Sequence, residues 1–202
     1  TIPHGHYLVI ERGSTLPLLK SYFNAFDAVS QSAYERLVGI GAKRFLDELD
    51  AAMHESIQAN MAEGGPIGVA LSGGVDSATL TAIAARHGDI QAINVSVPHG
   101  RDLDERPMAE AVARHVGVPL SIVTMSGDLY RRELVDATRA NEMPFWHVQN
   151  LGYYLASRRA RELGIRALLC GDTLPTALRL EGLDAATLAP SRLLHCGPPC
   201  PA

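Results

Sequence analysis

The chain has 202 residues, of which 47% are hydrophobic and 20% charged, and its formal net charge is −4. This length and composition suit one sizeable globular core, and the negative charge argues against binding nucleic acid by electrostatic attraction. No apolar run reaches the roughly 18–20 residues of a membrane span, no signal-peptide pattern opens the sequence, and three cysteines do not make a disulfide framework. We therefore expect a cytoplasmic protein with neither membrane nor nucleic acid as a partner.

The first third of the chain carries few regular patterns. Residues 6–10 read as a short strand, and the aromatic stretch at residues 16–26 is expected to be irregular. Residues 42–59 place apolar side chains at helical spacing, which predicts an amphipathic helix. That apolar stripe is interpreted as a packing face with no chemistry of its own.

From residue 66 to residue 172, short apolar runs alternate with helical segments. Strands are expected over residues 67–71, 90–97, 118–125 and 165–170, and helices over residues 78–85, 105–115, 129–140 and 148–163. This alternation predicts parallel βαβ units in a doubly wound α/β sheet. Ligands of such sheets lie beyond the carboxyl ends of the strands. Residues 72–77, 95–98, 126 and 171–172 should therefore surround one crevice.

The most informative segment is the string SGGVDS at residues 72–77, between the first of these strands and its helix. Two glycines let the backbone turn tightly and approach a ligand closely. The turn leaves free N–H groups at a helix N-terminus, which favours phosphate, and Ser72 and Ser77 add hydroxyl donors. Asp76 would repel a bare phosphate, so we expect it to hold a magnesium ion that the phosphates also contact.

The string SGGVDS after an apolar strand resembles the PP-loop of the ATP pyrophosphatases. Neither GxxxxGK[ST] nor a helix-opening GxGxxG occurs in the chain. The resemblance implies an adenine nucleotide alpha hydrolase-like (PP-loop) core. Enzymes of this superfamily cut ATP between the α and β phosphates, pass AMP to an acceptor and release pyrophosphate.

The flanking segments narrow the resemblance to the asparagine synthetase family. GHYL at residues 5–8, the long helix and GPIGVALSGGVDS at residues 65–77 resemble the junction between that family's glutaminase and synthetase domains. Asp104-Glu105 resembles the family's Asp-Glu that opens the next helix, and residues 150–172 resemble the helix and strand that lead to its second phosphate-side motif. The resemblance implies three parts. Residues 1–41 would be a strand and linker ending a glutaminase-like domain, residues 42–172 the PP-loop domain with its leading helix, and residues 173–202 an irregular tail.

The chain departs from the family pattern after the last predicted strand. The family continues into Ser-Gly-Glu-Gly-x-Asp-Glu, whereas this chain reads CGDTLPT at residues 170–176. Gly171 matches and Asp172 stands at the Glu position, but the later acidic pair is missing. A truncated product, a frame-shifted tail and a degenerate paralogue remain as interpretations. His195, Cys196 and Cys200 are a weak zinc pattern, and incidental cysteines in a tail are favoured.

The resemblance implies a mechanism with Mg-ATP as cosubstrate and Mg²⁺ as its metal. Ser72, Gly73, Gly74 and Ser77 would contact the phosphates, Asp76 would hold the metal, and Leu71 and Val95 would border the adenine and ribose. Gly171, in the second motif, would also belong to the ATP-binding residues. Aspartate or a related acid would be adenylated, and ammonia or another amine, which a separate glutaminase subunit could deliver, would displace AMP. Asp172 is the candidate catalytic base.

Other classes of function remain open at this point. A different PP-loop enzyme, such as an NAD or GMP synthetase or a tRNA-thiolating enzyme, would share the loop. A non-catalytic remnant that binds nucleotide would share it as well.

Overall fold

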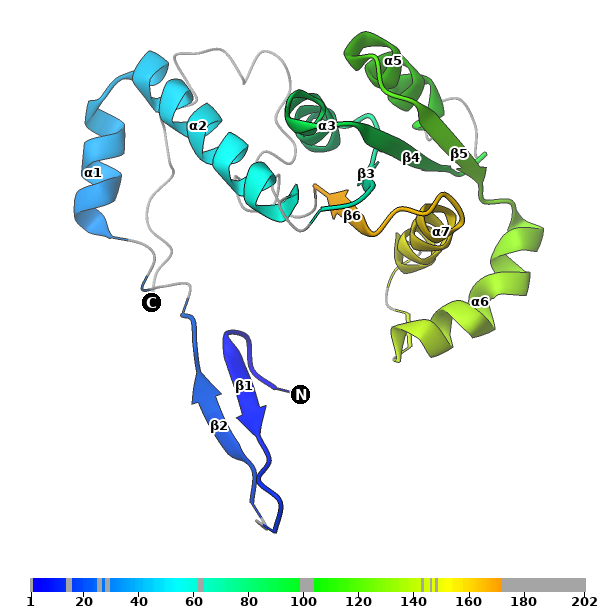
Figure 1. Ribbon diagram of the computed structural model, residues 1–202, viewed down its shortest axis with the longest axis horizontal. Coiled ribbons are helices and arrows are strands. Elements are labelled where there is room, and N and C mark those ends of the chain that lie inside the picture. The colour runs from blue at the N-terminus through cyan, green and yellow to red at the C-terminus, as the bar shows by residue number, and fades with distance from the viewer. Residues whose placement is uncertain are drawn as a thin grey trace. The chain divides into compact units, whose positions relative to one another are not determined.

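The computed structural model describes residues 2–13, 16–24, 27, 30–61, 64–98, 104–142, 144–145, 147 and 149–171 (Figure 1). The described residues form two compact units, one up to Leu49 and the other from Asp50. In the part of the chain that the structure describes, every helix is too short or too polar to cross a membrane.

The first unit contains a hairpin and a capped helix. Strand β1 (His6–Val9) pairs antiparallel with β2 (Leu18–Ser21). Helix α1 (Gln31–Gly39) begins after Ser30, whose hydroxyl accepts a hydrogen bond from Ala33 N at 3.0 Å. The expectation of an irregular stretch over residues 16–26 is therefore wrong for β2. All four residues of β2 are exposed, so the strand is held by its backbone ladder and shows no burial pattern in the sequence.

Helix α2 (Ala42–Met61) confirms the predicted amphipathic helix. Its second half belongs to the second unit, where Ile57 is buried beside the partly buried Met53 and Met61. These side chains pack against β3 and α3, as the apolar stripe predicts.

The second unit is built on a four-stranded parallel sheet in the order β5-β4-β3-β6. Its strands are β3 (Ile67–Ala70), β4 (Ile90–Ser96), β5 (Leu120–Thr124) and β6 (Ala167–Cys170). All four correspond to predicted strands and differ only at their ends. The central strand β3 pairs with β4 on one side and with β6 on the other, which brings the ends of distant segments together.

Helices cover both faces of this sheet, so the doubly wound α/β prediction is confirmed (Figure 1). Helices α3 (Val75–His87) and α5 (Arg106–Val116) pack on one face, through the clusters that contain Ile83 and Ala113. Helix α7 (Gln149–Glu162) packs on the other face, with Ala156 and Ala160 against Ile93. Helix α6 (Gly127–Asn141) lies against α7.

Candidate functional site

The loop from Ser72 to Gly74 connects β3 to α3 and folds on itself through serine hydroxyls. Ser77 Oγ accepts hydrogen bonds from the backbone N–H groups of Ser72 and Gly73, both at 3.2 Å. The same hydroxyl lies 2.9 Å from Ser72 Oγ and donates to Gly74 O at 3.1 Å. Ser77 is only 5% exposed, so its hydroxyl shapes the loop from within.

Gly73 is required by the backbone and by its surroundings. Its φ of +94° lies in the region that side-chain-bearing residues rarely adopt. A Cβ placed there would lie 2.5 Å from Met108 Cβ and 2.7 Å from Ala109 N, both on α5. Gly74 differs, because its φ is −67° and its nearest contact would be Ser72 Oγ at 3.4 Å.

Asp76 lies in the first turn of α3, next to the end of β6. The space beside Gly171 is bounded by Asp76, since a Cβ on this glycine would lie 3.3 Å from Asp76 C and 3.4 Å from Asp76 Cβ. Among the described residues, the Asp76 carboxylate has no hydrogen bond or ion pair, and no cluster of three metal-binding side chains occurs. Mg²⁺ needs no such cluster, because one carboxylate, water and substrate phosphates suffice.

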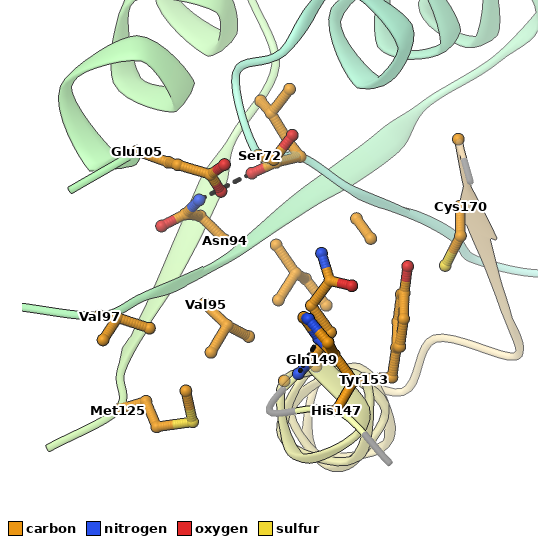
Figure 2. Close-up of a pocket in the computed structure, with 16 residues that line it drawn as sticks. Ser72, Asn94, Val95, Val97, Glu105, Met125, His147, Gln149, Tyr153 and Cys170 are labelled. Carbon is orange, nitrogen blue, oxygen red and sulfur yellow. Dashed lines mark hydrogen bonds between the residues drawn. The ribbon is translucent and has the colours of Figure 1, made fainter. Parts of the chain in front are cut away.

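A cavity of about 400 Å³ opens beside the loop, at the carboxyl ends of β3, β4 and β6 (Figure 2). It is lined by Ala70, Leu71, Ser72, Ile93, Asn94, Val95, Val97, Glu105, Met125, His147, Gln149, Gly152, Tyr153, Ala156, Cys170 and Gly171. The strand ends and α7 supply an apolar body, and a few polar groups stand at its edge. This composition is typical of a small-molecule site.

The structure brings most of the expected site residues together. Leu71, Ser72, Val95 and Gly171 line the cavity, and the remaining loop residues, 73–77, follow directly after Ser72. The candidate base Asp172 lies outside the described residues, as do all three residues of the tail's zinc pattern.

Ser126 does not line the cavity as expected, and Met125 does so in its place. The Ser126 hydroxyl caps α6 by accepting from Leu129 N at 3.1 Å. His147 lies two residues before α7 begins. It lines the cavity, and its Nδ1 accepts from Gln149 N at 3.3 Å (Figure 2).

Sequence reasoning placed Val95 of β4 at the cavity but missed Asn94 on the same strand and one face of α7. Gln149, Gly152 and Tyr153 lie on one face of α7, and their spacing of three or four residues was the available signal. Asn94 carried no signal at all, because its contact is with Leu71, 23 positions earlier in the chain.

The entry to α5 places a carboxyl group at the cavity. Ser96 Oγ donates to Asp104 Oδ1 at 2.9 Å, and the same oxygen accepts from Arg106 N at 3.1 Å. This pair fixes the turn that presents Glu105, consistent with the predicted role of Asp104-Glu105 in opening the helix. Partial burial raises the pKa of Glu105 above its usual value of 4.5.

The parallel sheet, the SGGVDS loop and the cavity at the strand ends together define an adenine nucleotide alpha hydrolase-like (PP-loop) domain. The model of the asparagine synthase family matches residues 48–173, and the chain belongs to this family.

Comparison with known proteins adds one curated relative. The chain is 24% identical over 84% of its length to "Asparagine synthetase B [glutamine-hydrolyzing]" from Escherichia coli (strain K12), and the match covers 31% of that protein. The chain thus spans about a third of the length of this relative.

Two solved structures are also similar, each at 13% identity over 66% of this chain. NMN synthetase from Francisella tularensis has a TM-score of 0.48, with 58% of that chain covered. The NH3-dependent NAD synthetase from Campylobacter jejuni subsp. jejuni NCTC 11168, in complex with the nitrate ion, has a TM-score of 0.45 with 59% covered.

The two loop glycines should respond differently to alanine. Gly73→Ala must adopt a positive φ, which costs about 1–3 kcal/mol, and its Cβ would also collide with α5. We expect it to lower stability in urea unfolding. Gly74→Ala is the matched control, and its stability should stay near wild type. Equal behaviour of the two variants would contradict the loop geometry.

Glu105 should make stability depend on pH. Because burial raises its pKa on folding, its protonated form favours the folded state, and that contribution is lost as the pH rises through the raised pKa. Glu105→Gln should therefore melt slightly higher than wild type at pH 7, and this gain should vanish below about pH 4. Thermal unfolding across this range is the measurement, with Glu55→Gln as a control for losing an exposed charge. If the melting-temperature gain of Glu105→Gln over wild type grew as the pH was lowered, it would contradict the raised pKa of Glu105.

Proposed function

We propose that this chain binds Mg-ATP, with the phosphates on the loop at residues 72–77 and the nucleoside in the adjoining cavity. The observation that carries the proposal is the preorganised loop. Hydrogen bonds to Ser77 Oγ fix the loop backbone, and Gly73, whose φ is positive, packs against α5. The loop also lies at the N-terminus of α3, where anions are favoured.

The cavity suits a nucleoside in size and lining. At about 400 Å³ it falls within the usual range for small-molecule sites. Leu71 and Val95 would border the adenine and ribose, and Gly171 would allow close approach from the end of β6. The described lining contains no Lys or Arg, which suits the uncharged nucleoside better than the phosphates.

The loop residues also fit a magnesium ion bound together with phosphates. Asp76 offers a carboxylate that no described residue pairs with, at the helix end where the β and γ phosphates would lie. The metal, when bound, would neutralise negative charge on the leaving pyrophosphate. Without it, a carboxylate at this position would weaken phosphate binding by repulsion.

The chemistry proposed for this site is carboxylate activation followed by amide formation. An oxygen of aspartate or a related acid would attack the α phosphorus, and the bond to the β-phosphate bridging oxygen would break to release pyrophosphate. Ammonia or another amine, which a separate glutaminase subunit could supply, would then attack the acyl carbon and expel AMP. Asp172 would accept the proton from the attacking nitrogen. The chain would thus act as a ligase domain of asparagine biosynthesis.

The role of Asp76 can be tested by titration calorimetry. We expect wild type to bind Mg-ATP, and Asp76→Ala to bind it about tenfold more weakly, or about 1.4 kcal/mol. When magnesium is withheld, Asp76→Ala should bind ATP more tightly than wild type, because the repelling carboxylate is gone. Asp128→Ala is the matched control, because Asp128 also lies in the first turn of a helix but away from the loop. Equal binding by wild type and Asp76→Ala would remove Asp76 as a metal ligand. No binding by wild type at millimolar nucleotide would overturn the proposal.

Turnover by this chain alone should be weak. The sequence after Asp172 reads TLPT where related synthetases carry a second acidic pair, and Pro175 lacks a backbone N–H. Pyrophosphate–ATP exchange with aspartate should therefore stay near background. Robust exchange with any amino acid of a panel would show that adenylation proceeds without the acidic pair.

A further inference from the structure

Asn94 stands out as a polar side chain on a strand that is otherwise mostly apolar. It lies in the middle of β4, lines the cavity and is only 1% exposed. Its Nδ2 donates a hydrogen bond to Leu71 O at 2.8 Å, as Figure 2 shows. Leu71 N in turn donates to Ile93 O at 2.8 Å. The residue directly before the phosphate loop is thus tied to β4 through both of its backbone polar groups.

The contact of Asn94 acts on the first peptide group of the loop. Leu71 C=O and Ser72 N–H belong to one planar peptide group. Asn94 holds the oxygen end of this group, and Ser77 Oγ holds the N–H end at 3.2 Å. One anchor comes from β4 and the other from α3. Rotating the peptide group would break both hydrogen bonds, so its direction, and that of the loop it starts, is fixed.

Stability alone does not explain an asparagine here. Asn94 Oδ1 is buried and has no hydrogen-bond partner in the described structure. A buried acceptor without a partner is destabilising. An apolar side chain of similar shape would remove this oxygen but would leave Leu71 O without its donor. What the asparagine contributes, and an apolar side chain could not, is the hydrogen bond that it donates to Leu71 O.

The neighbouring polar residue on the same face of β4 acts in a comparable way. Ser96 is 3% exposed and donates to Asp104, which opens α5. Asn94 and Ser96 are two residues apart and therefore point to the same side of the strand. Each reaches from the buried strand to a segment that borders the site.

We propose that Asn94 is a positioning residue for the phosphate loop, which it serves by orienting the Leu71–Ser72 peptide group. The proposal rests on the proposed binding of Mg-ATP at this loop. Asn94 makes no contact with phosphate in this role. Its effect on phosphate is transmitted through a single backbone group, so ligands that use the phosphate loop should depend on Asn94 more strongly than ligands that use only the cavity.

The test compares Mg-ATP with adenosine, which has no phosphates, in wild type and Asn94→Leu. We expect Asn94→Leu to weaken Mg-ATP binding about tenfold more than adenosine binding. It should melt near the wild-type temperature, because it removes the unpartnered oxygen but leaves Leu71 O without its donor. Gln91→Leu is the control on the same strand. Gln91 Nε2 also donates to a backbone carbonyl, that of Pro119 at 3.0 Å, but away from the loop. Its loss should leave Mg-ATP binding unchanged.

Asn94→Asp supplies a second and independent readout, and it serves alone if Asn94→Leu does not fold. The aspartate keeps the shape but can donate to Leu71 O only when protonated. Its Mg-ATP affinity, divided by that of wild type at the same pH, should rise as the pH is lowered from 8 toward about 5, because burial favours the neutral carboxyl.

Three outcomes would overturn the proposal. If Asn94→Leu binds Mg-ATP as wild type does, Asn94 has no positioning role. If Asn94→Leu and Asn94→Asp weaken the binding of Mg-ATP and of adenosine by the same factor and lower the melting temperature, Asn94 is a packing residue only. If wild type itself binds no Mg-ATP, the proposed function fails and this inference fails with it.

Discussion

The hydroxyl of Ser77 is the point on which the site depends. It accepts the N–H groups of Ser72 and Gly73 and donates to Gly74 O, so three successive residues of the loop are held by one atom. The hydroxyl is buried, where hydrogen bonds are stronger than in water and loss of a partner is costly. Because Ser77 belongs to α3, the loop is fastened to the helix whose N-terminus it opens, and its position follows the packing of that helix on the sheet.

The order of the strands explains why residues far apart in the sequence meet at this point. Strand β3 lies between β4 and β6, so the loop after β3 is flanked by Asn94 from one neighbour and Gly171 from the other. A glycine is needed at position 171 because any side chain would press on the backbone of Asp76 and Ser77. Gly73 meets the same demand from α5. The site therefore requires small residues where strands and helices converge, and polar ones where they must hold the loop.

The sequence predicted the core well, because there burial and local structure agree. The four parallel strands are apolar runs of strand length, and the SGGVDS string marks the one junction with a tight turn. Prediction failed where burial gives no signal. Strand β2 is exposed throughout and α1 buries no residue, so neither shows an apolar pattern. Ser30, a favoured N-cap residue, was the one sign of α1.

The site shows the same division between local and long-range features. The loop glycines and serines could be read from the sequence because they act within six residues of one another. Asn94 could not, since its place at the cavity depends on strand order. Long-range contacts of single polar side chains leave no periodic trace, and a structure is needed to find them.

The distribution of charge around the loop links these observations to the proposed chemistry. Among the described residues that line the cavity there is one carboxylate, Glu105, and no Lys or Arg. The loop itself adds a second carboxylate, Asp76, at the helix N-terminus. The N–H groups of Ser72, Gly73 and Gly74 are already hydrogen-bonded within the loop. A triphosphate placed there would meet the first N–H groups of α3 but no positively charged side chain of the loop. Backbone dipoles alone are weak against several negative charges. A divalent cation between Asp76 and the phosphates would offset the repulsion, which is why we propose Asp76 as the metal ligand.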